Sequence, residues 1–309
     1  EAFQGVLEAC LLRDFHRARA LSQELRDRQP DLPDVLLLAG DVEMQAGDPA
    51  AAGELYGRFL DETGRREDGI DRGEQVARAW FNLGNARDAG GDREGALAAW
   101  RNSLAVLPGG RDARFNLAVT LAGLGRLDEA AEELETLVAA DPTDTEANYN
   151  LGLARDAQQR PEEADRAYQR VLEADPAHAG ALVERARNLL AAGRGEEGLA
   201  LFRRAVAAHP DRPELANELA LILATHEDDR LRDGEEAERL ARMLVQATRE
   251  KQPAYLETLA AAEAEQGEYK EAARLQVKAL QLARGAGSVP GLASVMRSAS
   301  SLSGSVMST

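Results

Sequence analysis

The sequence predicts an all-α fold, a solenoid of antiparallel helix pairs. Four prolines lie 34 residues apart, and four small residues keep the same step (Pro108, Pro142, Pro176 and Pro210; Ala96, Ala130, Ala164 and Gly198). Self-similarity at a fixed period of this length is typical of repeat arrays. Hydrophobic residues make up 44% of the chain but aromatic residues only 4%, so Ala and Leu must fill closely packed helix interfaces. Because each repeat packs only on its neighbours, 309 residues do not require several globular domains.

The clearest repeat contains both helices of a pair. Residues 79–85 open the first helix, Gly90-Gly91-Asp92 make the turn, and the second helix ends at Pro108. Small residues stand where the helices cross closely, and Gly91 can adopt the positive φ of a tight turn. Proline cannot continue a helix. The second helix is expected to place three side chains on one face: Ala96, Trp100 and Ser103.

These residues resemble the tetratricopeptide repeat (TPR) family, whose 34-residue unit has small residues at positions 8 and 20 and proline at position 32. The family's W-x-x-L-G core stands here as Trp80, Leu83 and Gly84. The next three repeats keep the pattern: Leu117-Ala118 with Ala130 and Pro142, Leu151-Gly152 with Ala164 and Pro176, and Ala186 with Gly198 and Pro210. The family's tyrosine at position 11 is absent, so packing inside these repeats must differ; its places hold Arg87, Leu121 and Arg155. The resemblance implies a right-handed superhelix whose first helices line the concave face.

Extending the pattern in both directions predicts an array of about eight repeats over residues 1–284. The added repeats carry Val6, Ala18 and Pro30; Gly40 and Ala52; Ala220 and Ala237; and Ala260 and Ala272. Two steps are too long, which predicts insertions near residues 61–75 and 226–234. Residues 285–309 are rich in Ser and Gly and carry one charge. Two interpretations of this segment stay open: a flexible tail, or a short capping helix using Leu292, Val295 and Met296.

Charge and hydropathy exclude several classes of protein. The net charge of −17 argues against binding the phosphate backbone of nucleic acids, which requires a basic face. No apolar run approaches the 18 residues of a membrane span. Because the chain starts without methionine, a removed leader or an upstream domain stays open. We expect a cytoplasmic location, with the bacterial periplasm after removal of a leader as the alternative. The single cysteine, Cys10, is expected to be packed rather than reactive.

The sequence contains no pattern typical of catalysis. Its four histidines fall in four repeats and are expected at the surface or at helix ends: His16, His178, His209 and His226. Nucleophile and phosphate-binding motifs are absent, and glutamate pairs occupy helix starts. The cluster Glu227-Asp228-Asp229 lacks the spacing of a calcium loop. We therefore expect no enzymatic activity, no cofactor and no metal site.

The resemblance directs attention to the inner side of the first helices. Positions 5 and 6 of three consecutive repeats hold Phe81, Phe115 and Tyr149, and Asn82, Asn116 and Asn150. An asparagine offers both a donor and an acceptor to the backbone of an extended peptide, and aromatics can receive its apolar side chains. The arrangement is similar to the asparagine ladder inside the superhelix of O-GlcNAc transferase. The alternative is an inherited consensus in which the aromatics partly pack against the adjacent repeat.

Some TPR domains clamp a C-terminal carboxylate with basic groove residues and two asparagines. Asn85 and Asn116 match the asparagines of that clamp, but its basic places hold Phe81, Glu146 and Asn150. We therefore do not expect this clamp, because the ligand's charges would be unpaired. Four arginines stay available for local anion contacts: Arg78, Arg87, Arg155 and Arg187. The predicted binding groove comprises Arg78, Phe81, Asn82, Asn85, Phe115, Asn116, Tyr149 and Asn150.

Together these observations predict a non-catalytic interaction or scaffold module that binds an extended peptide or a helix of a partner protein. The main alternative is a substrate-docking or regulatory region of a larger enzyme whose catalytic domain lies outside this chain. A homo-oligomer, or a subunit of a larger assembly, is a further alternative.

Overall fold

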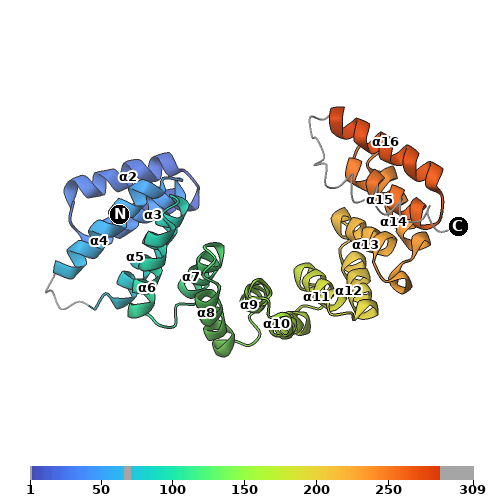
Figure 1. The fold of residues 1–309 in the computed structure, drawn as a ribbon. Helices are drawn as coiled ribbons and strands as arrows, with labels where there is room; N and C mark the ends of the chain where they lie inside the picture. The colour runs from blue at the N-terminus through green and yellow to red at the C-terminus, as the bar shows by residue number, and fades with distance from the viewer. Residues whose placement is uncertain (1, 66–70, 286–309) are drawn as a thin grey trace. The chain divides into compact units, whose positions relative to one another are not determined.

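A computed structural model describes residues 2–65 and 71–285 of the chain (Figure 1). Within these ranges it contains sixteen α-helices, one short 3₁₀ helix and no strand. The chain divides into two compact units, residues 1–171 and 172–309, which are described separately. The N-terminal unit contains α1 (Ala2–Leu11), α2 (Phe15–Arg28), α3 (Pro33–Gln45), α4 (Pro49–Arg65), α5 (Gly73–Ala89), α6 (Arg93–Val106), α7 (Arg111–Gly123), α8 (Leu127–Ala140), α9 (Thr145–Ala157) and most of α10 (Pro161–Ala174). The C-terminal unit contains α11 (Ala179–Ala191), α12 (Gly195–Ala208), α13 (Pro213–Thr225), η1 (Asp229–Leu231), α14 (Gly234–Ala247), α15 (Pro253–Glu265) and α16 (Tyr269–Gly285).

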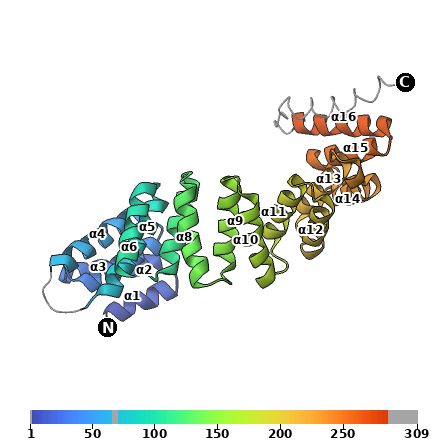
Figure 2. The same cartoon turned by 60° about the horizontal axis from the view of Figure 1, so that its bottom comes forward.

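Helices that follow one another in the chain pack together within each unit, as a solenoid of helix pairs requires. In the N-terminal unit α3 packs on α4, α4 on α5, and α5 on α6. Figure 2 shows α8 between α6 and α9, so the stack continues in chain order. In the C-terminal unit α11 packs on α12, α13 on α14, and α15 on α16. The predicted all-α solenoid of antiparallel helix pairs is confirmed.

The turns and helix ends follow the repeat residues. Gly91 has a φ of +84°, which only glycine adopts without strain, and it joins α5 to α6. The Asp92 side chain then accepts a hydrogen bond of 3.0 Å from the Gly95 N–H and caps α6. The helix ends at Val106, and Pro108 follows two residues later. The residues that mark the 34-residue period therefore also mark where each helix begins and ends.

Small residues on first helices make room for aromatic rings on second helices. A Cβ atom added at Gly84 would lie 2.4 Å from Nε1 of Trp100, which is 2% exposed. The same closeness recurs between Gly40 and Tyr56 (2.6 Å) and between Gly152 and Tyr168 (2.3 Å). The predicted close crossing is confirmed, and each time a ring sixteen residues further along the chain fills the space.

The residues that replace the family's position-11 tyrosine contact the second helix of their pair or its core. Arg87 donates a hydrogen bond of 3.1 Å to the Gly95 carbonyl, and Leu121 is buried in the core with Ala130. Arg155 is 8% exposed and lies 3.1 Å from a carboxylate oxygen of Glu163. These three side chains therefore help to hold the two helices of each pair together at this position.

The first insertion partly lengthens the helices on either side. The flanking helices α4 and α5 each contain 17 residues, whereas α6 contains 14 and α7 contains 13. Residues 66–70, in the middle of the predicted insertion, lie outside the described residues. The insertion therefore includes one added stretch of helix before the connection and another after it.

The second insertion forms η1 and packs on its own unit. Leu231 is 9% exposed, and its side chain occupies the space beside Gly195, where an added Cβ would lie 2.0 Å from Leu231 Cδ1. The Asp228 carboxylate pairs with Arg230 at 2.7 Å, and hydrogen bonds from Arg230 lower the pKa of Asp228 to about 2. The acidic cluster Glu227-Asp228-Asp229 thus contributes two ion pairs, Asp228–Arg230 and Asp229–Arg232, and Leu231 packs on the unit.

No helix in the described ranges is long and apolar enough to cross a membrane. The possible capping residues Leu292, Val295 and Met296 fall in residues 286–309, outside the described residues. The domain boundary at residue 284 and the nature of this segment stay predictions.

Candidate functional site

The eight predicted groove residues lie on α5, α7 and α9 of the N-terminal unit. All eight are exposed or partly exposed, so none is lost in the core. On α5, three of them recur at i, i+4 and i+7, which places them on one side of the helix: Arg78, Asn82 and Asn85. The repeat therefore brings the predicted residues to one surface of consecutive first helices.

Asn82 is joined to the preceding first helix through Asp41 of α3. Its Nδ2 donates a hydrogen bond of 3.0 Å to Asp41 Oδ1, and Tyr56 Oη donates another of 2.8 Å. A guanidinium nitrogen of Arg78 lies 3.6 Å from the second carboxylate oxygen. Burial raises the pKa of Asp41, although the hydrogen bonds from Tyr56 and Asn82 and the charge of Arg78 oppose this. Asp41 therefore holds two predicted groove residues in place.

Asn116 is joined to α5 in the same manner. Its Nδ2 donates a hydrogen bond of 3.0 Å to Asn85 Oδ1, which also accepts one of 3.2 Å from Trp100 Nε1. In both cases an asparagine at position 6 donates to position 9 of the previous repeat. We call these two hydrogen bonds the amide links, and the surface of Asp41, Arg78, Asn82, Asn85 and Asn116 the amide face.

The pattern stops at the third asparagine. Position 9 of the preceding repeat is Val119, which cannot accept a hydrogen bond through its side chain. Asn150 Nδ2 instead donates 2.9 Å to the Glu146 carbonyl within its own helix. The predicted series of three equivalent asparagines is therefore two links between helices followed by one residue bonded to its own helix.

The three predicted aromatic residues are shared between the surface and the core. Phe81 packs against the buried cluster of α6 and α7, and Phe115 against that of α8 and α9. The ring centroid of Tyr149 lies 6.0 Å from that of Tyr168. The alternative expectation, that these rings partly pack on neighbouring helices, describes this arrangement, and each ring still keeps an exposed part.

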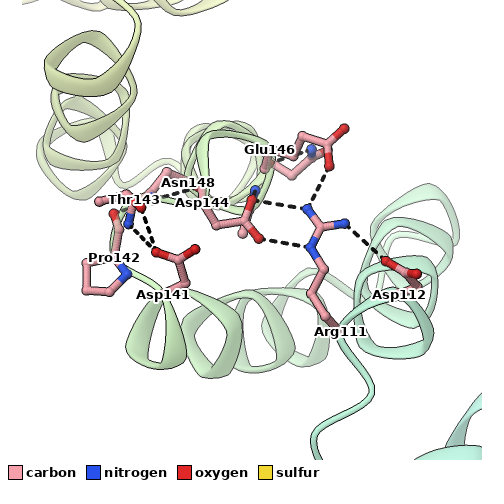
Figure 3. Close-up of polar contacts among 10 residues, drawn as sticks. Arg111, Asp112, Asp141, Pro142, Thr143, Asp144, Glu146 and Asn148 are labelled. Atoms are coloured by element: carbon pink, nitrogen blue, oxygen red, sulfur yellow. Dashed lines mark hydrogen bonds and ion pairs between the residues drawn. The ribbon is translucent and has the colours of Figure 1, made fainter.

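Arg111, the first residue of α7, contacts Asp144 and Glu146 at the start of α9, as Figure 3 shows. Its guanidinium donates two hydrogen bonds to Asp144, of 3.0 and 3.1 Å, and one of 2.6 Å to Glu146. It also lies 5.0 Å from the ring centroid of Phe115, a cation–π distance. Although burial raises the pKa of Asp144, hydrogen bonds from Arg111 and the Ala147 N–H lower it overall. These contacts of Arg111 join α7 to α9 beside the predicted groove.

Sequence reasoning missed Asp41 and Arg111, although both left a signal. Asp41 occupies position 9, as Asn85 does, but the ten inserted residues lengthen the step between them from 34 to 44. Arg111 opens one repeat, and Asp144 closes it. Aligning the repeats with the insertion removed would have placed Asp41 at the same position as Asn85, and Arg111 and Asp144 at the two ends of one repeat.

Two hollows border the amide face. The first, of about 370 Å³, is lined by Phe3, Leu7, Leu32, Asp34, Leu37, Leu38, Asp41, Gln75 and Arg78. The second, of about 250 Å³, is lined by Asn85, Asp88, Ala89, Trp100, Phe115, Asn116, Val119 and Thr120. Four predicted groove residues therefore line a hollow: Arg78, Asn85, Phe115 and Asn116. The first hollow extends to α1 and α3, beyond the predicted groove.

The matching positions of the C-terminal unit carry charges instead of amides. Arg187 of α11 donates hydrogen bonds of 2.8 Å to both Glu184 and Glu218. These three residues follow Asn82, Asn85 and Asn116 by three repeat steps. Although burial lowers it, the pKa of Arg187 is raised overall by its bonds to the two carboxylates. The charges of these three side chains are therefore paired with one another within the unit.

The remaining chemistry-bearing residues have structural roles. His178 caps α11 by accepting a hydrogen bond of 3.1 Å from the Ala181 N–H, and His209 and His226 stand at the ends of α12 and α13. Burial, and secondarily the charge of Asp41, raises the pKa of the Cys10 thiol, which packs on the core of α1 to α3. In the described residues, no group of three or more histidine, cysteine, aspartate or glutamate side chains is arranged to hold a metal ion.

Several solved structures share this fold at low sequence identity. The C-terminal part of a TPR repeat-containing protein from Cytophaga hutchinsonii matches with a TM-score of 0.68 and 13% identity, covering 79% of this chain and 94% of that one. A tetratricopeptide repeat protein from Parabacteroides merdae matches with a TM-score of 0.57 and 18% identity, covering 81% and 93%. YrrB, described as a TPR protein with an unusual peptide-binding site, matches with a TM-score of 0.53 and 18% identity, covering 64% and 96%. These likenesses concern the fold.

A search of curated proteins found no match. The family model described as tetratricopeptide repeat matches residues 12–66, 81–145, 149–213 and 183–229. These segments cover more than half of the chain and include the repeats in which the 34-residue period is clearest. The chain therefore belongs to the tetratricopeptide repeat family.

Proposed function

We propose that the amide face binds an extended segment of a partner protein and that the chain is a non-catalytic interaction or scaffold module. The amide links carry this proposal. Because Nδ2 of Asn82 and of Asn116 is already bonded to the previous repeat, each amide group has a fixed orientation. Their carbonyl oxygens are then acceptors at repeated positions, as the N–H groups of an extended chain require.

Two further observations support the proposal. Members of the family are generally non-catalytic interaction modules. YrrB, which shares this fold, is described as having a peptide-binding site, and the first helices of the present chain offer hollows beside fixed amides. A rigid array with prearranged polar groups loses little conformational freedom on binding.

The proposal is tested by selecting peptide ligands from a displayed library against the intact chain. Replacing Asn82, Asn116 and Asn150 together with alanine is expected to weaken the selected peptides about tenfold or more, because each lost hydrogen bond contributes about 1 kcal/mol. Helical circular dichroism should be unchanged. Equal affinity of the triple variant would overturn the assignment of the amide face.

The single variants provide an internal control. Asn150 bonds its own helix, so Asn150→Ala should change peptide affinity less than Asn116→Ala does. Light scattering over a concentration series tests self-association: a mass that rises with concentration supports the homo-oligomer instead. A selection that enriches no peptide would contradict the proposed function itself.

A further inference from the structure

The two hollows are lined by similar kinds of residue, and these indicate which side chains a partner would place in them. Each is lined by at least one exposed apolar side chain and at least one carboxylate. In the first hollow Phe3 is 37% and Leu7 51% exposed, and in the second Val119 is 41% exposed. Large apolar side chains left open to solvent beside a hollow favour burial of another apolar side chain.

Carboxylate side chains outnumber cationic side chains in the lining of the two hollows. Asp34, Asp41 and Arg78 line the first hollow, and Asp88 lines the second. Arg78 approaches Asp41, whereas Asp34 receives only a hydrogen bond of 3.3 Å from Gln75. Within the described residues, the Asp88 side chain has no ion pair or hydrogen bond. Each hollow therefore carries an uncompensated negative charge, on a chain whose net charge is −17.

The amide face connects the two hollows. Arg78 lies in the first hollow, Asn85 in the second, and Asn82 between them on the same side of α5. An extended backbone that follows the amides thus brings side chains to both hollows. Opposite charges favour the correct partner, and like charges disfavour acidic competitors.

Resting on the proposed function, we propose that the N-terminal unit selects a segment in which bulky apolar side chains alternate with lysine or arginine. The apolar side chains enter the two hollows, and the basic side chains pair with Asp34 and Asp88. Asp41 is already bonded by Tyr56 and Asn82, and it serves to position Arg78 and Asn82.

The test uses three fluorescent decapeptides with serine spacers: one carrying leucine and lysine, one with glutamate replacing lysine, and one with serine replacing leucine. Fluorescence anisotropy with the intact chain should show that the first peptide binds at least about tenfold more tightly than either of the others. Its affinity should fall as salt rises. Equal binding of the glutamate peptide, or no binding by the leucine–lysine peptide, would overturn the proposal.

Charge-reversal variants locate the effect. Asp88→Lys should weaken the leucine–lysine peptide about tenfold and improve the glutamate peptide. Glu132→Lys is the matched control, because Glu132 is exposed on α8 and lines neither hollow, and it should change both affinities less than about twofold. If both reversals act equally, the effect is one of net charge and the site is wrong.

A second readout comes from the buried indole in the second hollow. In a Trp80→Phe background Trp100 is the remaining tryptophan, and it lines that hollow. The leucine–lysine peptide should shift its emission, and Val119→Asp should abolish the shift while circular dichroism stays unchanged. If library peptides need the asparagines yet lack basic residues, this inference fails and the proposed function stands. Failure of the library selection would reject both.

Discussion

The first helices of the two units present the same repeat positions with different chemistry. In the N-terminal unit Asn116 donates a hydrogen bond to Asn85, and both residues line the second hollow, while Asn82 donates to Asp41. In the C-terminal unit the equivalent residues are Glu184, Arg187 and Glu218, which pair with one another. The repeat position therefore determines where a side chain lies on the surface. The residue type determines whether that side chain forms ion pairs within its own unit or stays available to a partner.

The largest expected effect concerns the space for aromatic rings, which also differs between the units. Gly84→Ala places a Cβ 2.4 Å from Nε1 of Trp100, whose ring is 2% exposed, so unfolding free energy should fall by about 1–3 kcal/mol. The matching position of the C-terminal unit is already alanine, Ala186. Urea denaturation followed by tryptophan fluorescence measures this, since both tryptophans, Trp80 and Trp100, lie in the N-terminal unit.

Gly57→Ala is the matched control. Gly57 lies inside α4, and an added Cβ there meets no atom within 4 Å. Its replacement should stabilise the unit by about 0.5–1 kcal/mol, because alanine favours helix. A destabilisation equal to that of Gly84→Ala would show that the close crossing is not the cause.

The next effect compares the central residue of each surface. Asn85→Leu removes the acceptor of the buried Trp100 N–H and of Asn116, so unfolding free energy should fall by about 1–2 kcal/mol. Arg187→Leu breaks ion pairs of a side chain that is 49% exposed, so it should cost about 1 kcal/mol or less. Chemical denaturation of both variants gives the order; a larger loss for Arg187→Leu would contradict it.

The smallest expected effect is on the pH dependence of stability, to which Asp41 and Asp144 of the N-terminal unit contribute in opposite directions. The pKa of Asp41 is raised, so its contribution to stability is greatest below the unfolded-state pKa and falls as pH rises through the folded one. The pKa of Asp144 is lowered, so its contribution is present above the unfolded-state pKa and is lost as pH falls through the folded one. Carbon-13 NMR titration of the two carboxyl groups should place Asp41 above and Asp144 below the usual aspartate value; the reverse order would refute the assignment.

The 34-residue period was sufficient to predict the helix pairs, because the freedom of Gly91 to adopt a positive φ and the inability of Pro108 to continue a helix act locally. It also placed the groove residues on one surface, since equal repeat positions face the same side. The period could not predict hydrogen-bond partners. Asn82 reaches Asp41 across an insertion, and Asn150 bonds its own helix because position 9 of the preceding repeat is Val119. Such contacts depend on individual side chains, as does the partial burial of Phe81 and Phe115.

A reciprocal exchange between the two surfaces tests the central claim most directly. One variant combines Asn82→Glu, Asn85→Arg and Asn116→Glu; the other combines Glu184→Asn, Arg187→Asn and Glu218→Asn. Calorimetry with a library-selected peptide should show a loss of about tenfold or more in affinity for the first and a change below about twofold for the second, with both variants folded. Retained affinity in the first variant, or a tenfold loss in the second, would contradict the account.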